Sequence, residues 1–101
     1  MSYEVYETNA ISELFDGLET DEKDWIVRMR VQIKENAFVG KPLRFVWFRE
    51  KKYKDKRLYY LIYEDKRRVL LVAFGDKKDQ QEIINSVLAN RERYRKIIES
   101  I

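Results

Sequence analysis

The hydrophobic pattern is strongest between residues 43 and 75, where three apolar runs alternate with polar connectors. The runs span about Leu43–Glu50, Arg57–Glu64 and Arg68–Gly75. Runs rich in β-branched and aromatic residues, separated by turn-forming residues, are typical of antiparallel strands that follow one another in a meander. Within the last run, Val69–Phe74 is apolar at every position, which predicts a central strand of the sheet.

Helical and strand periodicities also occur outside this region. The alternation at Tyr3–Glu7 predicts an N-terminal strand, after which Asn9 caps a helix. A second helix begins at Thr20 or Asp21, with acidic residues in its first turn, and the two helices form a hairpin that covers the sheet. Apolar residues recur near the helical period from Gln80 to the C-terminus, which predicts one final helix.

These elements predict an α+β fold. An N-terminal strand and a helical hairpin pack on a small antiparallel sheet, a meander of three strands, and a C-terminal helix completes the fold. At 101 residues, the chain from 1 to 101 is expected to form a single domain. No apolar run approaches the ~20 residues of a membrane span, and the polar N-terminus lacks the apolar segment of a signal peptide. We therefore expect a cytoplasmic protein with no membrane partner.

Charge is distributed unevenly along the chain. Residues 41–78 carry thirteen Lys and Arg against five Asp and Glu, whereas residues 1–40 carry four basic and nine acidic residues. The net charge of +3 therefore conceals a basic sheet attached to an acidic N-terminal region. A segregated basic surface is the electrostatic signature of a polyanionic partner such as RNA.

The chain contains no Cys and no His. It therefore has no thiol nucleophile and lacks the commonest general base and the commonest metal ligand. Any acid–base chemistry has to come from Lys, Tyr, Asp or Glu. No metal site is expected, because the acidic residues near Asp21 are explained by their favourable position at a helix N-terminus.

Three motifs on the predicted strands resemble those of a known family. They are WFRE from Trp47, KRLYYLIY from Lys56 and RRVLLVAFGDKKD from Arg67. Together with the element order, they resemble the RelE/ParE superfamily of bacterial and archaeal toxins, in particular its HigB-like or archaeal RelE-like branch. The matching residues are Arg49, Arg57 with Tyr59 and Tyr60, and Phe74 with Lys77 and Lys78.

The resemblance implies a RelE-like fold and the toxin of a type II toxin–antitoxin system. Such a toxin is an endoribonuclease that cuts mRNA on the ribosome and is neutralised by a cognate antitoxin protein. The implied chemistry needs neither a metal nor a small-molecule cofactor, because the 2′-hydroxyl of the RNA attacks the adjacent phosphate. Arg suits the phosphate because its planar fork matches two oxygens and stays charged, and nearby cations lower the pKa of a Lys or Tyr that transfers protons.

The resemblance also implies roles for particular residues. Arg49 and Arg57 would bind the phosphate, and Lys77 and Lys78 would supply charge or proton transfer. We expect these four side chains to meet in one groove, and the enzyme hypothesis depends on that meeting. The basic connector would hold the RNA backbone, with its tyrosine stacking on a base; the residues are Lys51, Lys52, Tyr53, Lys54 and Lys56.

Other interpretations remain open. Where some catalytic members of the family carry a C-terminal Tyr or His, this chain has Gln80, Gln81 and Glu82, and Glu82 or a tyrosine of the sheet is the candidate substitute. That departure favours an alternative in which the same fold binds nucleic acid without cutting it, or inhibits gyrase as the ParE branch does. A plain RNA-binding module is a third possibility. The lysines of the connector have a structural explanation as well, since Lys on an exposed hairpin discourages aggregation.

Overall fold

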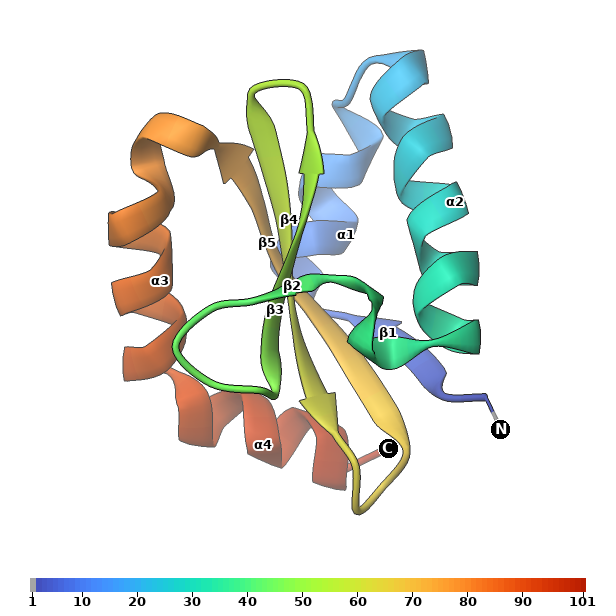
Figure 1. Ribbon diagram of the computed structural model, residues 1–101, viewed down its shortest axis with the longest axis vertical. Helices are drawn as coiled ribbons and strands as arrows, with labels where there is room; N and C mark the ends of the chain where they lie inside the picture. The colour runs from blue at the N-terminus through green and yellow to red at the C-terminus, as the bar shows by residue number, and fades with distance from the viewer. Residues whose placement is uncertain (1) are drawn as a thin grey trace.

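The computed structural model describes residues 2–101 as a five-stranded sheet between two pairs of helices (Figure 1). The strands lie in the order β1-β5-β4-β3-β2. The strands are β1 (Glu4–Glu7), β2 (Lys41–Pro42), β3 (Phe48–Tyr53), β4 (Lys56–Tyr63) and β5 (Arg68–Asp76). The helices are α1 (Asn9–Asp16), α2 (Thr20–Glu35), α3 (Gln80–Ala89) and α4 (Arg91–Glu99), with 3-10 turns η1 (Ala37–Val39) and η2 (Lys77–Asp79).

Each face of the sheet has its own hydrophobic core. Successive residues of a strand point to opposite faces, so neighbouring leucines of β5 enter different cores. Leu71 packs with Met29 of α2, on what we call the α2 face, and Leu70 packs with Ile84 of α3, on what we call the α3 face. Because helices cover both faces, β4 and β5 are almost entirely apolar where they are buried.

The α+β fold and the antiparallel meander of β3, β4 and β5 are confirmed. Val69–Val72 is buried in a strand with a neighbour on each side, as its continuous apolar character predicts. The sheet is larger than expected, because β2 adds a short edge strand beside β3. It is also mixed, since β1 pairs in parallel with β5, with Val5 opposite Val69.

The prediction of a single C-terminal helix is wrong. α3 ends at Asn90, whose side-chain amide donates to the carbonyl of Ser86 at 2.8 Å, and α4 then runs in a new direction (Figure 1). The apolar residues continue on both sides of this break, so periodicity alone did not reveal it. No helix within residues 2–101 is long and apolar enough to cross a bilayer.

Two predicted boundaries also differ. β3 begins at Phe48 instead of Leu43, because the Leu43 amide bonds to the Phe48 carbonyl at 2.9 Å and closes a chain reversal. Phe45 and Trp47 within the reversal stack on each other with ring centroids 4.7 Å apart. The first helix is capped by the side chain of Thr8, one residue before the expected Asn9.

The basic connector between β3 and β4 is much shorter than predicted. Tyr53 lies opposite Lys56, so only Lys54 and Asp55 form the turn and the rest of the connector belongs to the strands. Lys54 adopts a positive φ of 54° to make this tight reversal. The tip of the hairpin lies between the start of α2 and the start of α3 (Figure 1).

Candidate functional site

Arg49 lies on the α2 face, where it stabilises the chain between α2 and β3. It is opposite Tyr60 in the sheet and is only 9% exposed. Its Nε donates to the Val46 carbonyl at 2.8 Å, and its Nη1 donates to the carbonyls of Gly40 at 2.8 Å and Phe38 at 3.2 Å. These contacts explain a buried arginine without any substrate.

Arg57 lies on the α3 face, on the other side of the sheet. It is opposite Lys52 on β3 and Gly75 on β5, and a side chain at Gly75 would contact Ile83 of α3. The predicted meeting of Arg49 and Arg57 in one groove is therefore wrong. Arg57 is 7% exposed, and its hydrogen bonds to the described residues all come from Nη1, which donates to the carbonyls of Lys54 and Lys56.

Polar side chains gather around Arg57 on the α3 face. Glu50 lies opposite Tyr59, and Lys52 lies opposite Arg57. Gln80, the first residue of α3, reaches across to the sheet and donates from Nε2 to Oε2 of Glu50 at 2.6 Å. We call these five residues (Glu50, Lys52, Arg57, Tyr59 and Gln80) the α3-face cluster.

The hydroxyl of Tyr59 is buried and has no hydrogen-bond partner among residues 2–101. Burial, with the nearby Glu50 carboxylate as the next contribution, raises the pKa of this phenol, so it stays protonated at neutral pH. The adjacent Tyr60 is fully satisfied, since its hydroxyl donates to the Ala37 carbonyl at 2.8 Å and accepts from the Gly40 amide at 2.9 Å. An orphaned buried hydroxyl is costly and unusual, and it distinguishes the α3-face cluster from the packed core.

Lys77 and Lys78 lie in η2, at the end of the sheet that carries Arg57. Both are exposed, and the Lys77 amide donates to the Asp55 carbonyl at 2.7 Å, which joins η2 to the hairpin turn. The two lysines line a shallow hollow with Asp55 and Asp76. Arg57, Lys77 and Lys78 thus lie at one end of the sheet, but Arg57 does not line the hollow of the two lysines, and Arg49 lies on the opposite face of the sheet from Arg57.

The predicted RNA-binding residues are divided as well. The Tyr53 hydroxyl donates to Asp21 at 2.6 Å, and the Tyr53 ring stacks on Trp25 with centroids 4.9 Å apart. Lys56 forms an ion pair with Glu22. We call these five residues (Asp21, Glu22, Trp25, Tyr53 and Lys56) the hairpin latch, because they fix the hairpin to the start of α2.

The remaining lysines of the connector are more available. Lys54 forms a long ion pair of 3.4 Å with Asp21, and its side chain is still 71% exposed. Lys51 and Lys52 form no ion pair within the described residues, and only Lys52 faces α3.

The acidic start of α2 therefore has a role that the sequence did not reveal. The Tyr53 hydroxyl lowers the pKa of Asp21, and the Lys56 ammonium lowers the pKa of Glu22. Glu22 also completes the N-terminal capping box of α2 with Glu19. Within residues 2–101, no group of three or more acidic side chains is arranged to hold a metal ion.

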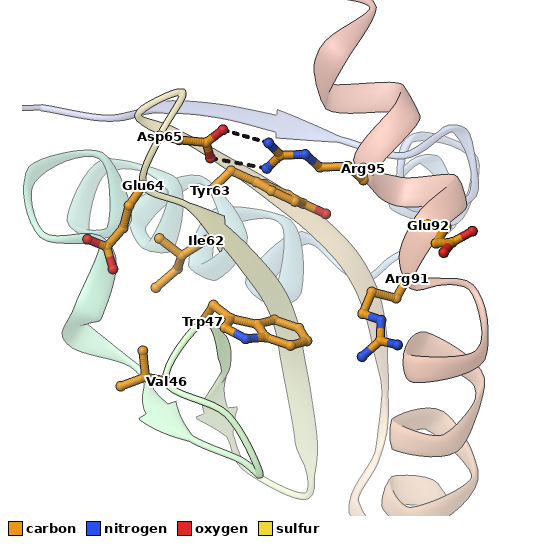
Figure 2. A pocket seen from close by; sticks show the side chains of 9 residues that line it. All are labelled: Val46, Trp47, Ile62, Tyr63, Glu64, Asp65, Arg91, Glu92 and Arg95. Atoms are coloured by element: carbon orange, nitrogen blue, oxygen red, sulfur yellow. Dashed lines mark hydrogen bonds and ion pairs between the residues drawn. The ribbon is translucent and has the colours of Figure 1, made fainter.

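A second hollow, of about 420 Å³, lies at the opposite end of the sheet (Figure 2). Trp47 and Ile62 form its apolar floor, and Arg91 of α4 borders it. Arg95 closes the rim through two hydrogen bonds to Asp65, at 3.1 and 2.6 Å. Sequence analysis did not predict this hollow, because it depends on the break between α3 and α4.

Several proteins of known structure share this fold. No protein-family model and no curated protein matches the sequence. The free form of a mutant Escherichia coli toxin RelE superposes with a TM-score of 0.74 at 16% identity, covering 90% of this chain and 98% of that chain. The chain has the RelE toxin fold. The RelBE2 toxin–antitoxin complex from Mycobacterium tuberculosis gives a TM-score of 0.65 at 20% identity over 75% of this chain and 99% of that chain.

The RelE fold is also found in an archaeal complex. The RelE–RelB complex from Pyrococcus horikoshii OT3 gives a TM-score of 0.64 at 12% identity, covering 75% of this chain and 96% of that chain. The predicted RelE-like architecture is thereby confirmed. The assignment to a HigB-like branch stays a prediction.

Proposed function

We propose that this protein is the toxin of a type II toxin–antitoxin system and that it cuts mRNA on the ribosome, in the cytoplasm. The observation that carries the proposal is the RelE fold, which covers 90% of this chain in the comparison with free RelE. The uneven charge of the sequence supports a polyanionic partner, because the basic residues are concentrated in the sheet region. Because Arg49 and Arg57 do not meet in one groove, the α3-face cluster, which contains Arg57 but not Arg49, replaces the expected four-residue groove as the proposed site of the chemistry.

Arg57 is the proposed phosphate ligand. Its Nη1 is held by two backbone carbonyls, while Nε and Nη2 make no hydrogen bond within residues 2–101. A guanidinium fixed on one side in this way can present its other nitrogens to a phosphate and stabilise the charge that develops as the 2′-hydroxyl attacks. Lys77 and Lys78 would add positive charge from η2, and the reaction would need no metal and no cofactor.

RNA contacts would come from the basic residues that remain available on the hairpin. Lys51, Lys52 and Lys54 are free or only weakly paired, so they are the proposed backbone contacts. Tyr53 and Lys56 are engaged in the hairpin latch, and an RNA contact from them would compete with Asp21 and Glu22. Arg49 is left out of the proposed site because its guanidinium is committed to backbone carbonyls on the α2 face.

The proposed partner is a cognate antitoxin protein. Several structures with this fold are complexes of a RelE toxin with an antitoxin, RelB or a RelB peptide. Acidic segments of an antitoxin would be attracted to the basic residues of the sheet region. The apolar hollow beside Trp47 offers a contact surface for its hydrophobic side chains.

Expression of the chain in bacterial cells tests the proposal. We expect growth arrest together with defined cuts in cellular mRNA, detected by primer extension. Arg57→Ala should relieve both effects, because it removes the proposed phosphate ligand. Arg28→Ala is the matched control, since Arg28 is exposed on α2 and its loss changes the net charge by the same amount. Absence of mRNA cuts, or full toxicity of the Arg57→Ala protein, would contradict the proposal.

A second candidate function keeps the fold without RNA cleavage. α3 begins with Gln80, Gln81 and Glu82, none of which is the Tyr or His that the resemblance leads one to expect. This departure favours a protein that binds nucleic acid or inhibits gyrase. DNA damage in expressing cells, without cuts in mRNA, would support that alternative.

A further inference from the structure

The strands contribute a single carboxylate to the α3-face cluster, that of Glu50. Glu50 is 8% exposed, and a carboxylate this buried requires an explanation. Its Oε2 accepts a hydrogen bond of 2.6 Å from Gln80, and no hydrogen bond within residues 2–101 reaches Oε1. One oxygen of the carboxylate is thus fixed, and the other is left to accept a proton or a hydrogen bond.

We propose that Glu50 is the general base of the reaction and takes the proton from the attacking 2′-hydroxyl. This inference rests on the proposed function and assigns the role that the absence of His leaves open. Glu50 is a buried carboxylate, anchored at Oε2, on the same face of the sheet as the arginine that would bind the phosphate.

The other members of the α3-face cluster are poorly suited to this role. A buried phenol such as Tyr59, whose pKa is raised by burial, keeps its proton at neutral pH, and the guanidinium of Arg57 is the proposed phosphate ligand. Lys52 is exposed to solvent, so its side chain is less well fixed than the buried carboxylate of Glu50. The amide of Gln80 is not basic. A carboxylate oxygen can accept the proton directly.

The spacing within the sheet also fits the chemistry. Glu50 and Arg57 lie on adjacent strands as diagonal neighbours on one face, because Glu50 is opposite Tyr59 and Arg57 is opposite Lys52. Diagonal neighbours of this kind are about 7 Å apart. Both side chains are long enough to be directed at one phosphodiester linkage from neighbouring positions, with the phosphate at Arg57 and the 2′-hydroxyl at Glu50.

Cleavage by the 2′-hydroxyl needs no co-reactant other than water. The proton of the 2′-hydroxyl passes to Glu50 as the 2′-oxygen forms a bond to phosphorus. The bond between phosphorus and the 5′-oxygen then breaks, and the leaving oxygen takes a proton from water. The products are a 2′,3′-cyclic phosphate and a 5′-hydroxyl, and Glu50 returns its proton to the solvent.

Glu50→Gln tests the assignment in the purified full-length protein with ribosome-bound mRNA. Glutamine keeps an oxygen that accepts from Gln80, so the fold should be retained, as checked by thermal unfolding. We expect cleavage to slow by about 100-fold or more, the usual contribution of a general base. The rise of the rate with pH should also disappear, and mRNA binding should not weaken. Added formate should partly restore cleavage by Glu50→Ala, which a purely structural role would not allow.

Two further variants make the outcome decisive. Glu64→Gln is the control, because Glu64 is exposed in the turn between β4 and β5 and its replacement changes the charge equally. Asp79→Asn tests a rival carboxylate, which is exposed in η2 and acts electrostatically on Tyr59. If the wild type cuts RNA and Glu50→Gln cuts it as fast with the same pH profile, or if only Asp79→Asn is slow, the assignment of Glu50 is overturned while the proposed function stands. If the wild type cuts no RNA, both the assignment of Glu50 and the proposed function are contradicted.

Discussion

Tyr59 and Tyr60 are adjacent in the sequence but differ in what their hydroxyls contact. Tyr60 makes two hydrogen bonds to η1 and its flank, whereas Tyr59 makes none within residues 2–101. Removing a satisfied buried hydroxyl costs stability, and removing an unsatisfied one avoids a desolvation penalty. We expect Tyr60→Phe to lower the free energy of unfolding by about 1–2 kcal/mol and Tyr59→Phe to raise it by about 1 kcal/mol.

Urea unfolding of the two variants measures this difference directly. Both substitutions delete one oxygen and leave the ring in place, so each serves as the control for the other. If Tyr59→Phe destabilises the protein as much as Tyr60→Phe does, the Tyr59 hydroxyl has a hydrogen-bond partner in solution. It is then not an unsatisfied group of the α3-face cluster.

The sequence identified both arginines but could not tell which face each occupies. In a paired strand, a shift of one residue moves every side chain to the other face. The expected long connector from Lys51 to Lys56 left the register of β3 against β4 undefined. A two-residue turn at Lys54 and Asp55 puts Arg57 opposite Lys52, and Arg49 then points to the other face. Recognising the two-residue turn would therefore have fixed the register of the strands. The sequence did not indicate this turn, because Lys54 adopts a positive φ and Lys is an unusual residue for that conformation.

At the scale of elements, the hairpin latch links the most basic turn of the chain to the acidic start of α2. The Lys56 ion pair lowers the pKa of Glu22 below its ordinary value of 4.5. A carboxyl group whose pKa is lower in the folded state stabilises the fold above that ordinary value, and the contribution is lost as the pH falls through the folded-state pKa. The latch should therefore weaken in acid.

Glu22→Gln tests this sign. Glutamine can still complete the capping box of α2, so the substitution removes mainly the ion pair. We expect it to lower the free energy of unfolding by about 0.5–1 kcal/mol at pH 7, because the pair is partly exposed. Chemical denaturation at a more acidic pH should show a smaller difference from the wild type, because protonation of Glu22 removes the ion pair. An equal loss of stability at both pH values would contradict the electrostatic explanation.

The elements themselves were largely predictable from the sequence. Val69–Phe74 indicated a central strand because it is apolar throughout, and the periodicity of the first two helices gave the hairpin that covers the α2 face. The break at Asn90 was not predictable from apolar spacing, because the stripe continues into α4. The α3-face cluster could not be found either, since Gln80 meets Glu50 only when α3 folds back onto the sheet.

At the scale of the whole molecule, the two ends of the sheet differ in character. The end with the hairpin tip carries Arg57, Lys77 and Lys78, and the opposite end carries the apolar hollow beside Trp47. An antitoxin that neutralises the basic residues should bind partly through charge. We expect the affinity of the complex to fall markedly as the salt concentration rises, measured by titration calorimetry with the cognate antitoxin. An affinity independent of salt would contradict this charge-based interaction and leave the apolar surface as the principal contact.

In the proposed function, residues of the α3 face direct the 2′-hydroxyl of mRNA to attack its adjacent phosphate. The most direct test is to incubate the purified protein with ribosome-bound mRNA and to determine the chemistry of the new 5′ ends. We predict defined cuts that leave 5′-hydroxyl ends, which can be ligated only after phosphorylation, and the loss of these cuts in Arg57→Ala but not in Arg28→Ala. Cuts that leave 5′-phosphates, equal cutting by the Arg57→Ala protein, or no cutting at all would contradict the account.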